Sequence, residues 1–556
     1  MLKIRQALLV AFFLFITQIA IGGEPPAKSG IASAHPLATQ AGFEILNQGG
    51  NAFDAAVAVS AALAIVEPSG SGLGGGGFWL LHRAEDGFQT MVDGRETAPA
   101  AAHRDMYLDA NGEFDKNLSL NGPLAAGIPG VPAALDHLSK HYGRLPLSKT
   151  LAPAIRLAKQ GFEVSERYQQ LVGFRLNTLN LSAEASTTFL DNGKTPQLGH
   201  LIVQANLATT LELIAKQGRA GFYQGPVAEK LISGVQQAGG IWTQQDLLNY
   251  QIQEREPITG QYHGYSITSA APPSSGGIAI MSILNQLEQL PFEQSTTTQK
   301  KHLLVEAMRR AYFDRSRYLG DSDFVKVPTQ KLISKNYAKT LAASIDPVQA
   351  SNSNDLSNAV SAKGEDTTHF SIIDNEGNRV SATLSINYPF GSAFVPEGTG
   401  VLLNDEMDDF SAQIGAANVY GLVGNEANAI EPNKRPLSSM SPTFIENDDK
   451  LMIIGTPGGS RIITMVLLGI LDFIDGKDAQ SIVNDPRFHH QYLPDAIQLE
   501  TLSFDESEVE ALKQRGHTIK QLNRKYGNMQ IVIQDKQTQT LSAASDPRGE
   551  GLAQVQ

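Results

Sequence analysis

The stretch Gly364-Glu-Asp-Thr-Thr-His-Phe-Ser-Ile-Ile373 joins a polar segment to a segment with the pattern of a β-strand. Residues 352–358, just before it, are rich in Asn, Ser and Asp, which favour turns and mark a linker. From Thr367 onward, β-branched residues and alternating polarity predict a strand, and a turn over 374–378 leads to a second strand over 379–386. The sequence therefore predicts a strand that begins with Thr367 directly after an accessible linker.

Thr367 can become a strong nucleophile only if the peptide bond between Asp366 and Thr367 is cut. Cleavage would free an α-amine whose pKa is about 7.7–8.0, and this amine could act as the general base for the hydroxyl of the same residue. The restricted χ1 of threonine would help to hold Oγ in position for attack. Two threonines at the start of a strand are common, however, so this pattern alone is also that of an ordinary strand.

The composition narrows the class of protein. A chain of 556 residues exceeds what a single small core serves, and its net charge of −13 argues against nucleic acid or anionic lipid as a partner. The absence of cysteine excludes disulfides, thiolate metal sites and a cysteine nucleophile.

The N-terminal residues 1–23 have the pattern of a secretory signal peptide. A basic start is followed by an apolar run over 7–21, which is short for the roughly 20 residues of a spanning helix. We therefore expect export to the periplasm and no stable membrane anchor after the signal is removed.

Helical patterns are frequent before the linker. Residues 35–48 have helical spacing and end at Gly49-Gly50, and Asn51 is placed to cap an apolar helix over 52–66. Residues 145–240 are mostly helical in pattern, and 301–319 form an amphipathic helix. The charged residues Arg309, Arg310 and Arg315 lie off the apolar stripe of that last helix. Together with the strands, these patterns predict a mixed α and β protein.

Several strings of this chain resemble the γ-glutamyltranspeptidase family and occur in the order of that family, over nearly everything after the signal peptide. The matching strings are Gly72-Leu-Gly-Gly-Gly-Gly-Phe78, Asp93-Gly-Arg-Glu-Thr-Ala-Pro99, Pro272-Pro-Ser-Ser-Gly-Gly277, Thr367-Thr-His-Phe-Ser371, Met407-Asp-Asp-Phe-Ser411, Asn433-Lys-Arg-Pro-Leu-Ser-Ser-Met-Ser-Pro442, Gly455-Thr-Pro-Gly-Gly-Ser-Arg461, Asp485-Pro-Arg-Phe-His-His490 and Ser545-Asp-Pro-Arg548.

The resemblance implies a catalytic set. Thr367 matches the threonine that becomes a new N-terminus and the nucleophile, after cleavage between Asp366 and Thr367. Gly458 and Gly459 match the pair whose backbone N–H groups form an oxyanion hole, and glycine allows such close approach. Ser385 stands where many relatives have a threonine proposed to support the new amine, so the hydroxyl is kept and a methyl group is lost.

The resemblance also implies a substrate-binding set. Arg95 matches the arginine that holds the substrate α-carboxylate, a role that suits the planar fork of a guanidinium. Asp409 matches the acid that receives the α-ammonium, although its neighbour Asp408 leaves open which of the two only caps a turn. The other matched residues are Asn387 and Glu406 beside the ammonium, Ser438 and Ser439 beside the carboxylate, and Tyr420 in a lid loop over residues 414–425.

By resemblance, the fold is α+β, the four-layer αββα sandwich of N-terminal-nucleophile hydrolases. Self-cleavage divides the chain into a signal peptide (1–23), a large subunit (24–366) and a small subunit (367–556) that stay together. The implied activity moves a γ-glutamyl group from glutathione or a related donor, through an ester on Thr367, to water or to an amino acid or peptide acceptor. No metal or organic cofactor is needed for this cycle.

Two other functions remain open at this point. A related acylase that removes glutaryl-like side chains from β-lactams needs Arg95 but has no use for Asp409, because glutaryl carries no α-amine. A non-catalytic periplasmic binding protein would keep the pocket but remain one uncut chain. The glycine run 72–77 lacks the ending and spacing of a nucleotide-binding loop, and His489-His490 have no third residue spaced to complete a metal site.

Overall fold

The computed structural model describes residues 25–353, 367–413, 418–422, 424 and 426–556. The predicted signal peptide, Asp366 with most of the predicted linker, and part of the predicted lid loop lie outside the described residues. In the part of the chain that is described, no helix is both long enough and apolar enough to cross a membrane.

A seven-stranded antiparallel sheet carries the strand that Thr367 precedes. Its order is β18 (Leu552–Val555), β1 (Gly30–Ser33), β9 (Thr368–Ile373), β10 (Arg379–Ser385), β2 (Gly76–Arg83), β3 (Phe88–Asp93) and β6 (Gln253–Arg255). The two strands predicted after the linker are confirmed as β9 and β10. They lie in the middle of the sheet, between strands from the N-terminal part of the chain.

A second sheet has six antiparallel strands. Its order is β17 (Thr540–Ser545), β16 (Gln530–Asp535), β12 (Lys450–Gly455), β11 (Thr443–Glu446), β8 (Tyr265–Ser269) and β7 (Ile258–Tyr262). Two smaller sheets are formed by β13 (Phe488–His489), β14 (Ile497–Leu499) and β15 (Ile519–Gln521), and by β4 (Phe162–Glu163) and β5 (Leu201–Ile202).

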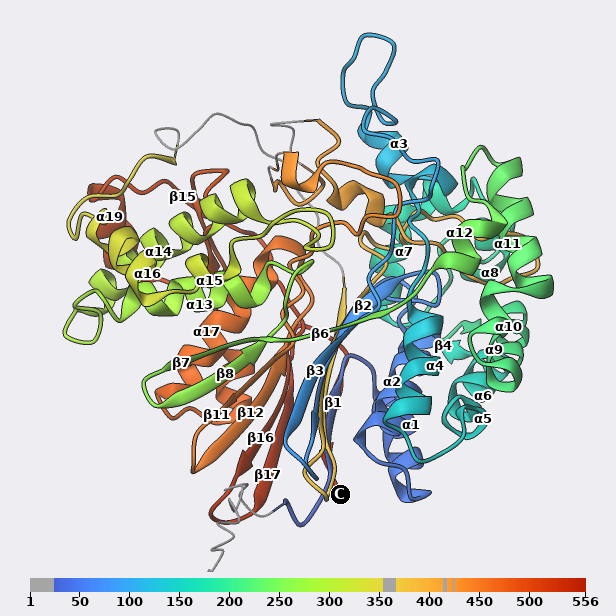
Figure 1. Ribbon diagram of the computed structural model, residues 1–556, viewed down its shortest axis with the longest axis horizontal. Helices are drawn as coiled ribbons and strands as arrows, with labels where there is room; N and C mark the ends of the chain where they lie inside the picture. The colour runs from blue at the N-terminus through green and yellow to red at the C-terminus, as the bar shows by residue number, and fades with distance from the viewer. Residues whose placement is uncertain (1–24, 354–366, 414–417, 423, 425) are drawn as a thin grey trace, which may run out of the picture.

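The two large sheets pack face to face (Figure 1). Polar side chains of β9 and β10 bond across the interface: Ser371 Oγ donates to the carbonyl of Gln530 at 3.0 Å, and Ser381 Oγ donates to the carbonyl of Ile454 at 3.1 Å. Side chains alternate between the faces of a strand. The alternate residues of β10 therefore face the other way, into the core around α2 (Ala52–Val66): Val380, Ala382 and Leu384.

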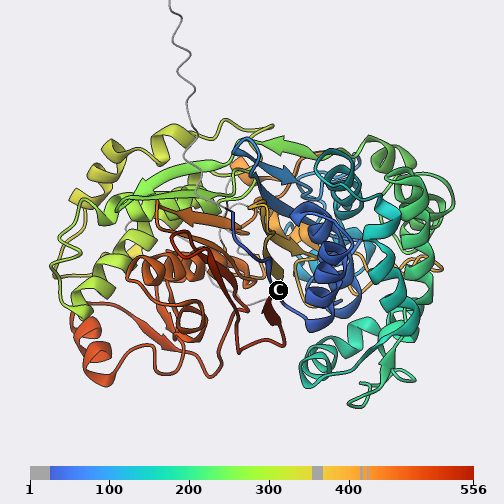
Figure 2. The same ribbon diagram turned by 90° about the horizontal axis from the view of Figure 1, so that it is seen from below.

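Helices cover the outer faces of both sheets, and Figure 2 shows the two groups on opposite sides of the strands. Beside the first sheet lie α1 (Pro36–Asn47), α2, α4 (Val131–His141), α5 (Leu147–Thr150), α6 (Ala152–Gln160), α7 (Glu166–Leu179), α8 (Ala183–Phe189), α9 (Ala205–Gln217), α10 (Ala220–Tyr223), α11 (Gly225–Gln237) and α12 (Gln244–Asn249). Beside the second lie α13 (Gly276–Leu287), α14 (Thr297–Tyr318), α15 (Thr329–Leu332), α16 (Lys335–Ala343), α17 (Ile462–Ile474), α18 (Ala479–Asn484) and α19 (Glu506–Gln514). A short helix, α3 (Lys116–Leu120), lies near the upper end of the strands.

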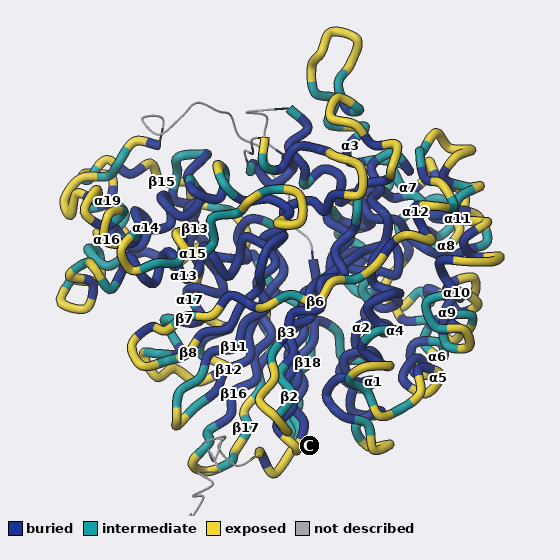
Figure 3. Tube along the Cα trace, viewed as in Figure 1, coloured by how far each residue is buried: buried dark blue, intermediate teal, exposed yellow. Residues whose placement is uncertain are grey.

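The helices predicted on either side of Asn51 are confirmed. Asn51 accepts hydrogen bonds from the backbone of Phe53 and Asp54, and Asp54 accepts one in return from the backbone of Asn51, which forms a capping box at the start of α2. Every residue of α2 is buried, as expected for a helix that is apolar on most faces (Figure 3).

The helix predicted from residue 301 begins earlier, at Thr297, because Thr296 caps it. Arg309, Arg310 and Arg315 lie off its apolar stripe, yet all three are buried. The face of α14 that the pattern marks as charged therefore lies against other elements, where each guanidinium must find polar partners.

Candidate active site

One pocket of about 290 Å³ collects the predicted site residues. All of the predicted catalytic and binding residues line it except Gly458 and the undescribed Asp366: Arg95, Thr367, Ser385, Asn387, Glu406, Asp409, Tyr420, Ser438, Ser439 and Gly459. The sequence assigned no individual role to the remaining lining residues: Leu422, Met440, Ser460 and Ile462. Met440 and Ser460 lie inside matched strings, and Leu422 lies in the predicted lid loop, so the sequence did mark the segments that contain them.

Thr367 lies at the head of β9 and is 4% exposed. Its Oγ1 lies 3.4 Å from Oγ of Ser385, at the end of the neighbouring strand β10. Behind it, the Thr368 hydroxyl bonds to the carboxylate of Glu67, and burial raises the pKa of Glu67 to about 7. The pairing of β9 with β10 thus brings the two predicted hydroxyls together.

Close backbone packing positions Ser385. The glycine run that precedes β2 lies against it, and a Cβ at Gly75 would overlap the carbonyl oxygen of Ser385. Beyond Ser385, Asn387 has a φ of +73° and donates its backbone N–H to Ser385 Oγ at 2.8 Å. The glycine run therefore serves the packing of the site, and the tight turn after β10 fixes the direction of the Ser385 hydroxyl.

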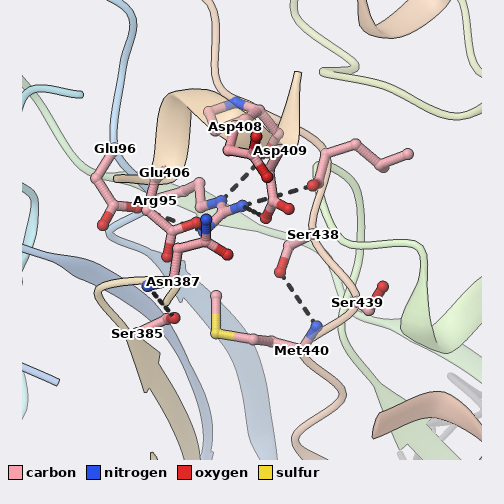
Figure 4. Close-up of polar contacts among 12 residues, drawn as sticks. Arg95, Glu96, Ser385, Asn387, Glu406, Asp408, Asp409, Ser438, Ser439 and Met440 are labelled. Carbon is pink, nitrogen blue, oxygen red and sulfur yellow. Dashed lines mark hydrogen bonds and ion pairs between the residues drawn. The ribbon is translucent and has the colours of Figure 1, made fainter. Parts of the chain in front are cut away.

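Arg95 lies between two acidic residues, as Figure 4 shows. Its Nη1 is 2.7 Å from Glu406 Oε2 and its Nη2 is 2.6 Å from Asp409 Oδ2, and its side chain is 1% exposed. Its Nε donates to the carbonyl of Pro436 at 3.2 Å. The groups predicted to hold the two charges of an amino-acid head are thus in direct contact with each other.

The acids around Arg95 have shifted pKa values. Burial raises the pKa of Glu406 to about 7, even though Arg95 acts in the opposite direction. Burial likewise raises the pKa of Glu96, whose Oε2 is 3.5 Å from Arg95 Nη1. Burial lowers the pKa of Arg95, but Glu406 and Asp409 outweigh it and raise the pKa overall. The guanidinium stays charged, whereas Glu406 can change protonation near neutral pH.

Asp408 and Asp409 make different contacts. Asp408 accepts from the hydroxyl of Ser119 at 2.7 Å and from the backbone of Val419 at 2.8 Å, so it fixes the loop. Asp409 lines the pocket, and its Oδ1 accepts from the Asn418 side chain at 2.9 Å. Of the two acids, only Asp409 therefore borders the pocket.

Ser438 and Ser439 form the wall beside Arg95. The Ser438 backbone N–H donates to the carbonyl of Pro273 at 2.8 Å, and its Oγ accepts from the backbone of Met440 at 3.1 Å. The Ser439 hydroxyl accepts a hydrogen bond from Arg315 Nη2 at 3.3 Å. Both serines line the pocket, and two of the residues that hold them, Pro273 and Arg315, do not.

Gly458 and Gly459 have φ values of +141° and +56°, which favour glycine. They precede α17, at a helix N-terminus where backbone N–H groups are free of intrahelical partners. Within the described residues, neither glycine N–H donates a hydrogen bond. Gly459 lines the same pocket as Thr367, whereas Gly458 lies just outside its lining.

Tyr420 covers one side of the pocket. Its hydroxyl donates to the carbonyl of Asn387 at 2.7 Å, and its ring lies against Gly459, where a Cβ would overlap it. Tyr420 belongs to the described part of the predicted lid loop, residues 418–422 and 424, and it lies over Gly459.

His489 and His490 have ordinary hydrogen-bond partners. His489 contacts Thr464 Oγ1 at 2.8 Å and Gln491 Oε1 at 2.7 Å through its two ring nitrogens. His490 Nε2 is 3.2 Å from Asp495. In the described part of the chain, no group of three or more His, Asp or Glu side chains is arranged to hold a metal ion.

The family model of gamma-glutamyltranspeptidase matches residues 38–555 of this chain. The chain belongs to this family. It is 44% identical over 530 residues to a glutathione hydrolase proenzyme of Escherichia coli (strain K12), a match that spans 94% of this chain and 91% of the relative. It is 41% identical over 535 residues to a glutathione hydrolase proenzyme of Pseudomonas aeruginosa, a match that spans 94% of each.

Solved structures agree with this membership. A gamma-glutamyltranspeptidase of Helicobacter pylori superposes with a TM-score of 0.56 and 42% identity, over 57% of this chain and 92% of that one. A cephalosporin acylase from Bacillus halodurans superposes with a TM-score of 0.84 and 28% identity, over 98% of this chain and 99% of that one. The gamma-glutamyltranspeptidase family is thus supported by sequence and by structure, and the acylase shares its architecture at lower identity.

Proposed function

We propose that this protein is a self-processing γ-glutamyltransferase that cleaves γ-glutamyl bonds and passes the γ-glutamyl group to water or to an amine. The observation that carries the proposal is the pocket itself. Thr367, Ser385 and Gly459 line it, and so do Arg95, Asp409 and Ser438. The proposed nucleophile and the residues that would bind the two charges of an amino-acid head therefore line one cavity.

Substrate recognition follows from the two opposite charges. A free α-amino-acid head brings a carboxylate for Arg95, Ser438 and Ser439, and an ammonium for Asp409. Glu406 and Asn387 stand beside the ammonium. Binding such a head exchanges the internal contacts of Arg95 for contacts with the ligand, so no charge is left unpaired. The carbonyl that reacts then lies further along the ligand, as in a γ-glutamyl group.

The reaction has two steps. Thr367 Oγ1 attacks the γ-carbonyl, the α-amine of Thr367 takes the hydroxyl proton, and the N–H groups of Gly458 and Gly459 stabilise the oxyanion. The intermediate collapses to an ester on Thr367, and the leaving amine departs with the proton. Water or an acceptor amine then attacks the ester, which releases glutamate or a new γ-glutamyl product. With glutathione as donor, the leaving amine is cysteinylglycine.

Self-processing would use the same hydroxyl. Thr367 Oγ1 attacks the carbonyl of Asp366, the acyl group moves from nitrogen to oxygen, and water opens the ester to leave a free α-amine on Thr367. The products are the subunits 24–366 and 367–556. The names of two similar proteins, glutathione hydrolase proenzymes of Escherichia coli and Pseudomonas aeruginosa, support this processing. Removal of residues 1–23 on export would place the mature pair in the periplasm.

The architecture is consistent with the proposed mechanism. We assign it to the four-layer αββα sandwich of N-terminal-nucleophile hydrolases, because two antiparallel sheets pack face to face and helices lie on both outer faces. In such an arrangement, a strand of the first sheet can present its N-terminal residue at the end of the interface between the sheets.

An acylase acting on glutaryl-like groups is the second candidate, since a cephalosporin acylase superposes over nearly the whole chain. A glutaryl group has a carboxylate for Arg95 but no ammonium. Asp409, with its side chain 13% exposed at the pocket, would then face an apolar part of the ligand. The pair Arg95 and Asp409 therefore favours a γ-glutamyl donor.

The test begins with intact mass and a denaturing gel of the purified protein beside Thr367→Ala. Two fragments that divide between Asp366 and Thr367, in the wild type only, are expected. A γ-glutamyl anilide and a glutaryl anilide are then compared as substrates, with faster release from the γ-glutamyl compound expected. One uncut chain that releases no product would instead support a binding protein, and preference for the glutaryl compound would support the acylase.

A further inference from the structure

Arg315 is a buried cation behind the wall of the pocket. It lies in the last turn of α14 and is 5% exposed. Its Nε donates to Ser275 Oγ at 3.0 Å and its Nη2 donates to Ser439 Oγ at 3.3 Å. Among the described residues, no carboxylate lies within ion-pair distance of it. Arg315 and Asp409 both line a second cavity, distinct from the pocket, but they form no ion pair with each other.

Two other buried arginines of α14 form ion pairs with a carboxylate. Arg309 and Arg310 both pair with Glu306, at 3.2 Å and 2.8 Å. An arginine keeps its charge in a protein, and a buried charge without an opposite charge is unfavourable. Burial accordingly lowers the pKa of Arg315. Its two neutral serine partners leave a positive charge that the described structure does not balance by an ion pair.

Both hydrogen-bond partners of Arg315 connect it to the wall formed by Ser438 and Ser439. Ser439 lines the pocket itself. Ser275 donates its backbone N–H to the carbonyl of Ser438 at 2.8 Å, and its hydroxyl to the same carbonyl at 2.7 Å. Arg315 therefore contacts one serine directly and holds the other through Ser275.

Arg95 is already paired with acidic residues, so a second cation would help the pocket to bind a carboxylate. Glu406 and Asp409 already share its guanidinium. A carboxylate that enters must compete with both, and its attraction to Arg95 is reduced by the neighbouring negative charges. A positive charge one side chain behind Ser439 would restore that attraction, because interactions in a buried site are less screened than in water.

We propose that Arg315 is a positioning residue that sets the specificity for donors with a free α-carboxylate, through its charge and through its hold on Ser438 and Ser439. This inference rests on the proposed γ-glutamyl activity and deepens it. Arg315 does not touch the donor. It polarises the Ser439 hydroxyl, so that this hydroxyl donates to the carboxylate while its oxygen accepts from the guanidinium.

The experiment compares two anilide donors that differ only at the α-carbon, one with a free carboxylate and one with a carboxamide. Arg315→Gln is compared with Arg315→Lys and with the matched control Arg317→Gln, an exposed arginine on the same helix that does not line the pocket. Appearance of the two fragments and the melting temperature verify that each variant matures and folds.

For the carboxylate donor, Arg315→Gln should raise KM about tenfold or more, as expected for the loss of one buried charge, with a smaller change in kcat. The KM of the carboxamide donor should change little. Arg315→Lys should recover part of the loss, and Arg317→Gln should behave as the wild type. If Arg315→Gln does not mature, Arg315→Lys should still show a selective but smaller rise in KM, because an ammonium does not reproduce the fork between the two serines.

Equal changes for the two donors, or no change, would overturn the role of Arg315. A wild-type protein that releases no anilide from the carboxylate donor would instead overturn the proposed function. The two failures are therefore distinguishable.

Discussion

At Gly459, both the backbone conformation and the shape of the pocket require glycine. Its φ is +56°, and a Cβ there would overlap the ring of Tyr420. Alanine at this position keeps the backbone N–H, but its Cβ would clash with the Tyr420 ring and its φ would be strained. Gly459→Ala should therefore move this donor away from the oxyanion and lower kcat by up to about 10²–10³, the range for loss of one such donor. Steady-state kinetics on a γ-glutamyl anilide measure this. Gly476→Ala is the matched control, because Gly476 has a φ of +88° with open space around it. A loss of kcat as large in the control would assign the effect to backbone strain.

Glu406 should make stability depend on pH near neutrality. Burial raises its pKa from 4.5 to about 7, so the folded state binds this proton more tightly than the unfolded state. The contribution of Glu406 to the free energy of unfolding is present at low pH and falls, by on the order of 2–3 kcal/mol, as pH rises from about 4.5 to about 7. The melting temperature of Glu406→Gln minus that of the wild type should therefore be larger at pH 8 than at pH 5. A difference that is constant with pH would contradict this titration.

At the scale of elements, Tyr420 covers part of the pocket, and we predict that the segment around it controls access. Its hydroxyl bonds to Asn387 and its ring covers Gly459, so Tyr420→Ala, or shortening of the loop 414–425, should open the site. The ratio of kcat/KM for a bulky γ-glutamyl donor to that for a small one should rise. Tyr420→Phe keeps the ring and should change this ratio little. Unchanged selectivity in the shortened variant would show that this segment is not a lid.

Local patterns predicted the elements better than the contacts between them. The cap at Asn51 and the apolar run of α2 are short-range features, and so is the strand after Thr367, so the sequence located all three. The contact of Arg95 with Asp409 joins residues far apart in the chain, and no periodicity encodes it. Burial of Arg309, Arg310 and Arg315 depends likewise on partners from other elements, such as Ser275 and Ser439. The resemblance to family motifs, rather than periodicity, predicted that these residues share one site.

At the scale of the whole molecule, the proposed cut would divide both sheets without separating their strands. In the first sheet, β9 and β10 come from residues after Thr367, yet β9 pairs with β1 and β10 pairs with β2, both from before it. In the second sheet, β11 from the later part pairs with β8 from the earlier part. Each fragment therefore completes the backbone hydrogen bonding of the other.

We expect the two fragments to co-elute in size-exclusion chromatography of the native protein and to separate only in denaturant. Residues 367–556 expressed alone should lack a stable fold, because β9, β10 and β11 would each expose an edge that β1, β2 and β8 now cover. Co-expression with residues 24–366 should restore a soluble pair with native circular dichroism. A folded, monomeric fragment 367–556 would contradict this, since it would mean that the strands from before Thr367 are dispensable to the sheets that hold the nucleophile.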